Sequence, residues 1–145
     1  MEVTLEIKKI EKEDLVNLLS TSVYGSTTFA LDWDEDEYRQ FSVEGDCYED
    51  VLAKMLLAGK TIFVLDFESE ECSYGNLPHE WDVEEYCMKY TVGLEDIKKG
   101  IAKAFEHGEY ARECVTDFIN DNGNLDLSEV EELLQWIVFG ESVYG

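Results

Sequence analysis

The chain contains several short stretches in which apolar and polar residues alternate, the pattern of a half-buried strand. These stretches cover residues 2–9, 29–33 and 86–92. Residues 61–67 are almost all apolar, as expected of a central strand that is buried on both faces. The polar stretch 68–82 contains the only proline and predicts a long loop. The pattern therefore predicts four strands.

Apolar residues that recur every three or four positions predict five helices. The first begins at residues 13–14, and the second follows the capping-box pair Asp46 and Glu49. Three more close the chain, and Ser128 with Glu131 begins the last of them. The apolar stripes are Leu15, Val16, Leu18 and Leu19; Val51, Leu52, Met55 and Leu56; Leu94, Ile97, Ile101, Ala104 and Phe105; Tyr110, Cys114, Val115, Phe118 and Ile119; and Val130, Leu133, Leu134, Ile137 and Val138.

The predicted order is strand, helix, strand, helix, two strands and three helices. This order indicates an α+β fold, with a small, mostly antiparallel sheet of about four strands covered by about five helices. No stretch reads as a linker, so we expect residues 1–145 to form a single domain.

The acidic residues add a strong charge to this fold. The 145 residues include 34 Asp and Glu against 11 Lys and Arg, which gives a net charge of −23. Residues 31–50, 61–88 and 113–145 hold nine, eight and eight acids with one base, Arg39. A field this negative repels DNA, RNA and anionic membranes, so we expect none of these as a direct partner. The 45% apolar content argues against disorder.

Neither a membrane span nor a secretory signal is visible in the sequence, so we expect a cytoplasmic protein with reduced thiols. The cysteines at 47, 72, 87 and 114 form no Cys-x-x-Cys pair, which argues against zinc or a redox dithiol. Cys87 and Cys114 fall in a predicted strand and helix, where we expect small buried side chains.

The sequence shows no catalytic motif. Its two histidines, His79 and His107, lie in the acidic loop and at a predicted helix end, and neither belongs to a recognisable nucleophile–base pattern. The ten glycines form no phosphate-binding loop. We therefore predict that the protein is not an enzyme and that it has no catalytic residues, no metal site and no cofactor.

Residues 118–129 imitate part of an EF-hand calcium loop. Loop positions three, five, six, eight, nine and twelve are Asn120, Asn122, Gly123, Leu125, Asp126 and Glu129. The first position is Phe118 instead of Asp, which removes the ligand that begins the coordination shell. The same segment reads as a helix-ending turn followed by an N-cap at Asp126 or Ser128, and we favour the turn. Calcium binding by the segment stays open.

Two segments carry a resemblance to known proteins: YTVGLEDIKKGIAKA at 90–104 and LLQWIVFGESVYG at 133–145. They resemble short acidic proteins of unassigned function encoded on phages and mobile elements of gut bacteria. The resemblance implies a mobile-element setting, in which compact acidic proteins often act against host defence. It implies no catalytic residues.

The main functional hypothesis follows from the charge. A rigid protein that presents carboxylates at helical spacing would fit the basic groove of a nucleic-acid-binding protein. We therefore expect an inhibitor of a host restriction or CRISPR-type nuclease. Trp33, Tyr38 and Trp81 lie among the acids as potential anchors, although core packing suits Trp33 better than Trp81. The predicted partner-binding residues are Asp32, Asp34, Glu35, Asp36, Glu37, Glu68, Glu70, Glu71, Glu80, Trp81, Asp82, Glu84 and Glu85.

Two alternatives remain at this stage. The protein could be an interaction module or homodimer, with its apolar ending, residues 136–139 and 143–144, packed on its own sheet or on a second copy. It could also bind calcium or a small ligand through residues 118–129 or the loop 68–82.

Overall fold

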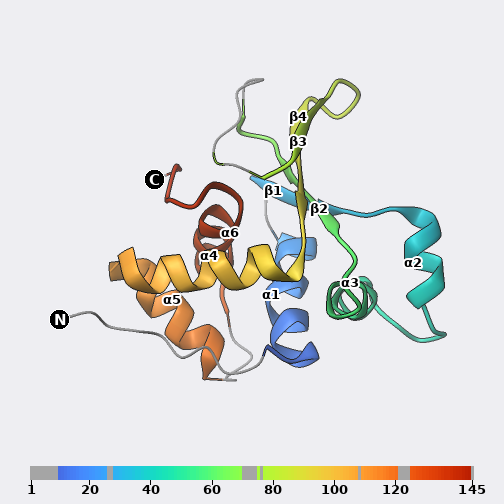
Figure 1. The fold of residues 1–145 in the computed structure, drawn as a ribbon, viewed down its shortest axis with the longest axis horizontal. Helices are drawn as coiled ribbons and strands as arrows, with labels where there is room; N and C mark the ends of the chain where they lie inside the picture. The colour runs from blue at the N-terminus through green and yellow to red at the C-terminus, as the bar shows by residue number, and fades with distance from the viewer. Residues whose placement is uncertain are drawn as a thin grey trace.

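The computed structural model describes residues 10–25, 28–69, 75, 77–107, 109–120 and 125–144, with only the backbone for 21–25. The predicted strand over 2–9 lies outside these residues. Within them, six helices and a four-stranded antiparallel sheet form an α+β fold, as the sequence predicts (Figure 1). None of the described helices is long and apolar enough to cross a membrane.

The sheet has the strand order β1-β2-β4-β3. Its strands are β1 Phe29–Asp32, β2 Ile62–Asp66, β3 His79–Asp82 and β4 Cys87–Val92. The apolar strand β2 lies between two others, as the continuous run at 61–67 predicts. At one end of the sheet Asp32 pairs with Phe63, and Phe63 with Thr91. At the other end Asp66 pairs with Met88, and Asp82 pairs with Cys87.

Strand β3 corrects the prediction of an unbroken loop over 68–82. Among the described residues it is an edge strand that pairs only with β4, and His79 and Glu80 on it are exposed. An edge strand with little burial does not need the apolar alternation by which strands are recognised, so its polar sequence reads as loop.

The five predicted helices are confirmed as α1 Lys12–Gly25, α3 Tyr48–Leu57, α4 Leu94–His107, α5 Glu109–Ile119 and α6 Leu127–Phe139. Leu18 of α1, Ile97 of α4 and Leu134 of α6 line one small apolar void with residues of β1, β2 and β4, so these three helices cover the same face of the sheet. Helix α3 packs against α1. The core is therefore shared by the sheet and helices from both ends of the chain.

The apolar ending of the chain packs on this core. Residues 136–139 are buried, and the rings of Phe139 and Tyr144 lie 5.8 Å apart. The ring of Phe29 on β1 lies 6.3 Å from that of Tyr144. Two arrangements were predicted for this ending, packing on its own sheet or on a second copy. The described residues pack on their own sheet.

A sixth helix, α2 Glu35–Phe41, was not predicted. Asp34 caps it and three acids fill its first turn, where negative charge interacts favourably with the amide groups of the helix N-terminus. None of its residues is fully buried. Because it is short and lacks an apolar stripe, periodicity does not reveal it.

Two helix starts differ from the predicted capping boxes. Cys47 and Asp50 form the box of α3, one residue after the predicted pair Asp46 and Glu49. The Asp46 carboxylate instead lies 2.6 Å from Lys54 Nζ and accepts a hydrogen bond from the Val43 amide. Helix α6 begins with the pair Asp126 and Glu129 instead of Ser128 and Glu131.

Candidate functional site

The N-cap and the first turn of α2 hold four consecutive acids, and we call residues 34–37 the acidic turn. Asp34 Oδ1 accepts a hydrogen bond of 3.0 Å from the Glu37 amide and so caps the helix. Asp34, Glu35 and Asp36 are exposed and Glu37 is half-buried. Among the described residues, no Lys, Arg or His forms an ion pair with any of the four. The helix start therefore holds these carboxylates together and leaves their charge to solvent.

Three aromatic rings fix α2 against α3. The Trp33 ring stacks on that of Tyr38 with centroids 5.1 Å apart, and it lies 5.1 Å from the Tyr48 ring. Tyr38 and Tyr48 close the triangle at 6.0 Å. Burial, followed by the nearby Tyr48 and Asp46, raises the pKa of the Tyr38 hydroxyl. Trp33 is thus a packing residue, as predicted, but it packs beneath the acidic turn. Tyr48 was not predicted as part of this cluster, because it lies 15 residues after Trp33 in the sequence.

Asp32 differs from the acidic turn because it has a basic neighbour. Its carboxylate lies 3.8 Å from Lys89 Nζ and accepts a hydrogen bond of 2.9 Å from the Trp33 amide. Lys89 Nζ also lies 4.1 Å from the centroid of the Phe63 ring. Glu80 is the register partner of Lys89 on the neighbouring strand. Lys89 therefore offsets part of the negative charge on this sheet. Its place in the sequence, between the acidic stretches 61–88 and 113–145, did not predict this contact.

The second group of predicted residues lies at the β3–β4 turn. Asp82 Oδ1 accepts hydrogen bonds of 3.0 Å from the amides of Glu84 and Glu85, so its carboxylate orders the turn. Glu84 and Glu85 themselves are exposed. Trp81 is half-buried, and its ring meets that of Tyr86 edge to face at 5.9 Å. We call Asp82, Glu84 and Glu85 the hairpin acids.

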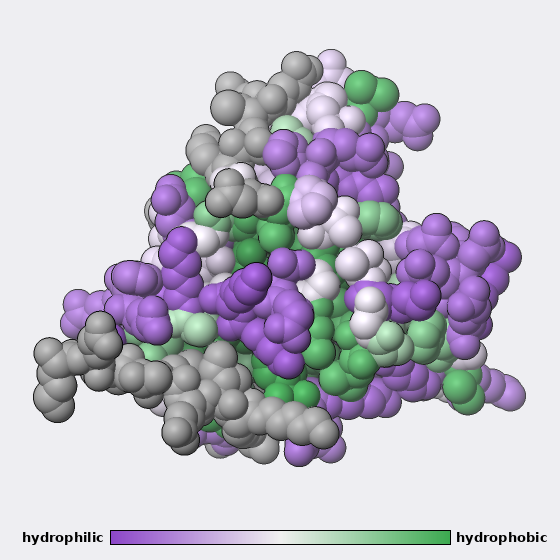
Figure 2. All heavy atoms as spheres, in the orientation of Figure 1, coloured by the Kyte–Doolittle hydropathy of each residue, from purple (hydrophilic) through white to green (hydrophobic). Residues whose placement is uncertain are grey.

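The fold separates the two groups. Asp32 is the last residue of β1, level with Thr91 of β4, and the acidic turn follows it. The hairpin acids lie beside Cys87, which is four residues from Thr91 along β4, and β3 is three strands from β1 across the sheet. Strand geometry puts these corners about 20 Å apart. Glu68 follows β2 at the hairpin end. In Figure 2 hydrophilic residues gather over α2, whereas hydrophilic and hydrophobic residues lie side by side at the hairpin. Glu70 and Glu71 lie outside the described residues.

The described cysteines differ in burial. Burial raises the pKa of the Cys87 thiol to about 11 and that of Cys114 to about 12. Both side chains are fully buried, as predicted, and Cys47 is exposed. Cys72 lies outside the described part of the chain.

Residues at the start of α6 serve as a helix cap. Asp126 Oδ1 accepts from the Glu129 amide at 2.9 Å, and Glu129 Oε1 accepts from the Asp126 amide at 3.3 Å. Burial, together with a hydrogen bond to Asp117, raises the pKa of Glu129 to about 7. Phe118, in the first position of the EF-hand-like pattern, is buried in α5. Of the two caps predicted, Asp126 or Ser128, the structure has Asp126. Residues 121–124 lie outside the described part, and no cluster of metal-ligating side chains occurs in the part that is described.

Comparison of the chain with protein-family profiles, with curated proteins and with solved structures gives no match.

Proposed function

We propose that this protein is a non-enzymatic inhibitor that binds the basic nucleic-acid groove of a host defence protein, of the restriction or CRISPR-type nuclease class. The acidic turn at the start of α2 is its main contact. The observation that carries the proposal is a block of four carboxylates, held by a helix cap and an aromatic cluster, with no ion pair to the described cations.

The charge density of the acidic turn supports this proposal. Four residues of α-helix rise about 6 Å along the axis, so the turn presents four negative charges in that length. Double-stranded DNA carries one charge per about 1.7 Å, or three to four in the same length. A groove that binds phosphates through Lys and Arg therefore meets a similar local field at the acidic turn.

The aromatic cluster supports the proposal in a second way. Trp33, Tyr38 and Tyr48 fix the backbone beneath the carboxylates, so binding would not require the turn to order first. Tyr48 is 47% exposed, which leaves an aromatic edge beside the acids for apolar contact. The hairpin acids, about 20 Å away, supply a second contact only to a partner whose groove is long enough.

The proposal is tested by competition with DNA. Purified restriction and CRISPR-type nucleases are incubated with labelled DNA, and the loss of bound DNA is measured as the protein is added. The variant E35Q/D36N/E37Q removes three charges from the acidic turn and keeps the cap Asp34. The variant E68Q/E84Q/E85Q removes three charges at the hairpin end and is the matched control.

We expect at least one nuclease to lose DNA to the wild-type protein at low salt. The acidic-turn variant should need at least tenfold more protein for the same effect, and the control should change this amount less. The proposal is wrong if no nuclease in the panel releases DNA, or if both variants compete as well as the wild type. Circular dichroism checks that the variants keep their helix content.

A further inference from the structure

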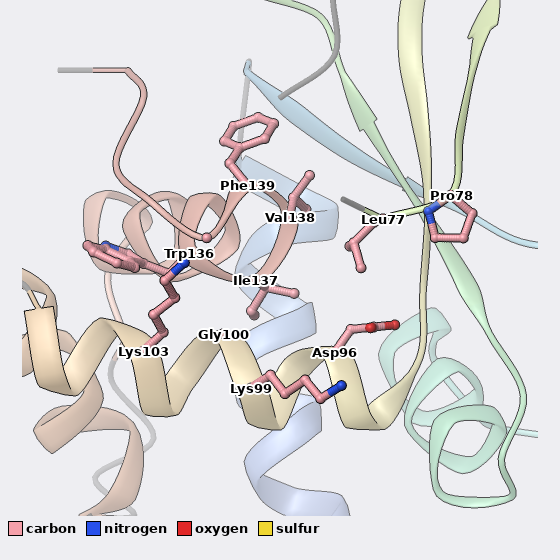
Figure 3. Close-up of a pocket in the computed structure, with 11 residues that line it drawn as sticks. Leu77, Pro78, Asp96, Lys99, Gly100, Lys103, Trp136, Ile137, Val138 and Phe139 are labelled. Carbon is pink, nitrogen blue, oxygen red and sulfur yellow. The ribbon is translucent and has the colours of Figure 1, made fainter. Parts of the chain in front are cut away.

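A groove of about 450 Å³ lies between α4, the end of α6 and the segment before β3 (Figure 3). One wall is the face of α4 with Asp96, Lys99 and Lys103, which recur at helical spacing. The opposite wall is residues 136–140, and Leu77 with Pro78 closes one end. Its volume falls within the range of small-ligand sites, about 300–1,000 Å³.

In this groove two lysines, Lys99 and Lys103, lie beside an apolar wall. Among the described residues Lys99 and Lys103 form no ion pair, although the chain has 34 acids. Their neighbour Lys98 is paired, with its Nζ 3.3 Å from Glu95 Oε1. Within the described part of the chain, the two groove lysines therefore offer positive charge that no ion pair neutralises.

The groove has distinct ends. In Figure 3 the Lys103 side chain points toward Trp136, and Lys99 points toward the Asp96 carboxylate. The Lys103 ammonium lies at the end of α6, because a Cβ placed on Gly140 would be only 2.9 Å from Lys103 Nζ. Asp96 Oδ2 accepts a hydrogen bond of 2.8 Å from the Gly93 amide, which leaves a negative group beside Lys99. The Lys103 end is thus the more positive one.

Between these ends the lining is apolar. Leu77 is half-buried and Pro78 is exposed, whereas Ile137 and Val138 of α6 line the groove but are almost completely buried. A ligand that matches both features has one anionic group and an apolar body. A carboxylate at Lys103 would form a charge-assisted hydrogen bond, and an alkyl chain would cover Leu77 and Pro78.

We propose that this groove binds a small amphipathic carboxylate, with the carboxylate at Lys103 and the apolar body along Leu77 and Pro78. The site is separate from the acidic turn, which lies on α2, and it does not depend on the nuclease hypothesis. Octanoate is the probe, because its single charge and short alkyl chain match the two parts of the groove.

The test is calorimetric titration with octanoate in about 0.15 M salt, which screens the distant acids. Acetate and octanol separate the contributions of charge and chain. The variant K103Q removes the proposed anion contact, and K98Q, which removes a lysine paired on the same helix, is the matched control. The variant L77A shortens the apolar wall without altering Lys103.

We expect one saturable octanoate site, weakened at least tenfold in K103Q and unchanged within twofold in K98Q. Octanol and acetate should each bind at least tenfold more weakly than octanoate. Should K103Q fail to fold, a loss of octanoate affinity in L77A with no change for acetate supports the site. Equal binding of octanol and octanoate, equal affinity in K103Q and K98Q, or no saturation up to about 10 mM octanoate overturns the proposal.

Discussion

At the scale of single residues, Asp66 is the least exposed acid of the described chain. It is fully buried at the end of β2, and Tyr144 Oη donates a hydrogen bond of 2.7 Å to its Oδ2. The Glu68 amide donates to the other oxygen at 3.0 Å. Burial raises the pKa of Asp66, and these hydrogen bonds lower it in part. One hydroxyl group thus ties the end of the chain to the sheet.

The variant Y144F should lower the free energy of unfolding at pH 7.5 by about 1–3 kcal/mol, because a buried carboxylate loses a donor. A raised folded-state pKa means that stability is lost as pH rises from the unfolded value through the folded one. Removing Tyr144 Oη raises that pKa further, so the loss in Y144F should be larger at pH 7.5 than at pH 4.5. Urea unfolding at both pH values measures it.

The matched control is Y110F, because Tyr110 Oη shares a hydrogen bond of 3.0 Å with Ser128 Oγ at an exposed position. It should change stability by less than about 0.5 kcal/mol at either pH. A Y144F penalty that is equal at the two pH values, or smaller than that of Y110F, would contradict the role given to Asp66.

At the scale of elements, the crossing of α4 and α6 depends on Gly100. A Cβ at this position would lie 2.7 Å from the backbone nitrogen of Ile137 and similarly close to its Cα. Backbone cannot move aside as a flexible side chain can, so the two helices would have to separate. The same crossing forms the floor of the groove that Lys99 and Lys103 line.

The variant G100A should lower the midpoint of thermal unfolding strongly, with a loss of about 2–4 kcal/mol from overpacking. The control is G93A, because a Cβ at Gly93 would lie 3.6 Å from its nearest atoms. This variant should lose no more than about 1 kcal/mol of unfolding free energy. Calorimetric melting of both variants checks this. A G100A variant as stable as G93A would show that the helices do not cross this closely.

The elements found from sequence are those with a buried stripe. In α4 the residues Ile97, Ile101 and Ala104 are buried. Their spacing of three or four residues predicted the helix because it places them on one buried face. Helix α2 and strand β3 escaped prediction for the opposite reason: their residues are mostly solvent-exposed, and a cap or a single neighbouring strand holds them. Local chemistry such as Asp34 signals a helix start only once the next residues are known to be helical.

The acidic residues of the candidate site were predicted from the sequence, but their arrangement in space was not. The acids of α2 and the hairpin were both identified from charge, but only the strand register places them at different corners of the sheet. The contact of Asp32 with Lys89 and the role of Asp82 in its turn also depend on partners that lie far along the chain or on turn geometry. Charge patterning does not contain this information.

At the scale of the whole molecule, a net charge of −23 opposes compaction and favours association with basic surfaces. The fold offsets a few acids through Lys54, Lys89 and Lys98. It leaves the acidic turn on one side and the hairpin acids on another, while Lys99 and Lys103 line the groove. The molecule therefore presents charge of both signs in separate places.

The most direct test of the central claim is the salt dependence of binding to a nuclease that releases DNA in the competition experiment. We predict that affinity falls steeply as salt rises, and that E35Q/D36N/E37Q weakens binding most at low salt and has a shallower slope. The hairpin variant should keep a steeper slope than the acidic-turn variant. A wild-type affinity that does not change with salt, or identical slopes for the wild type and the acidic-turn variant, would contradict the claim.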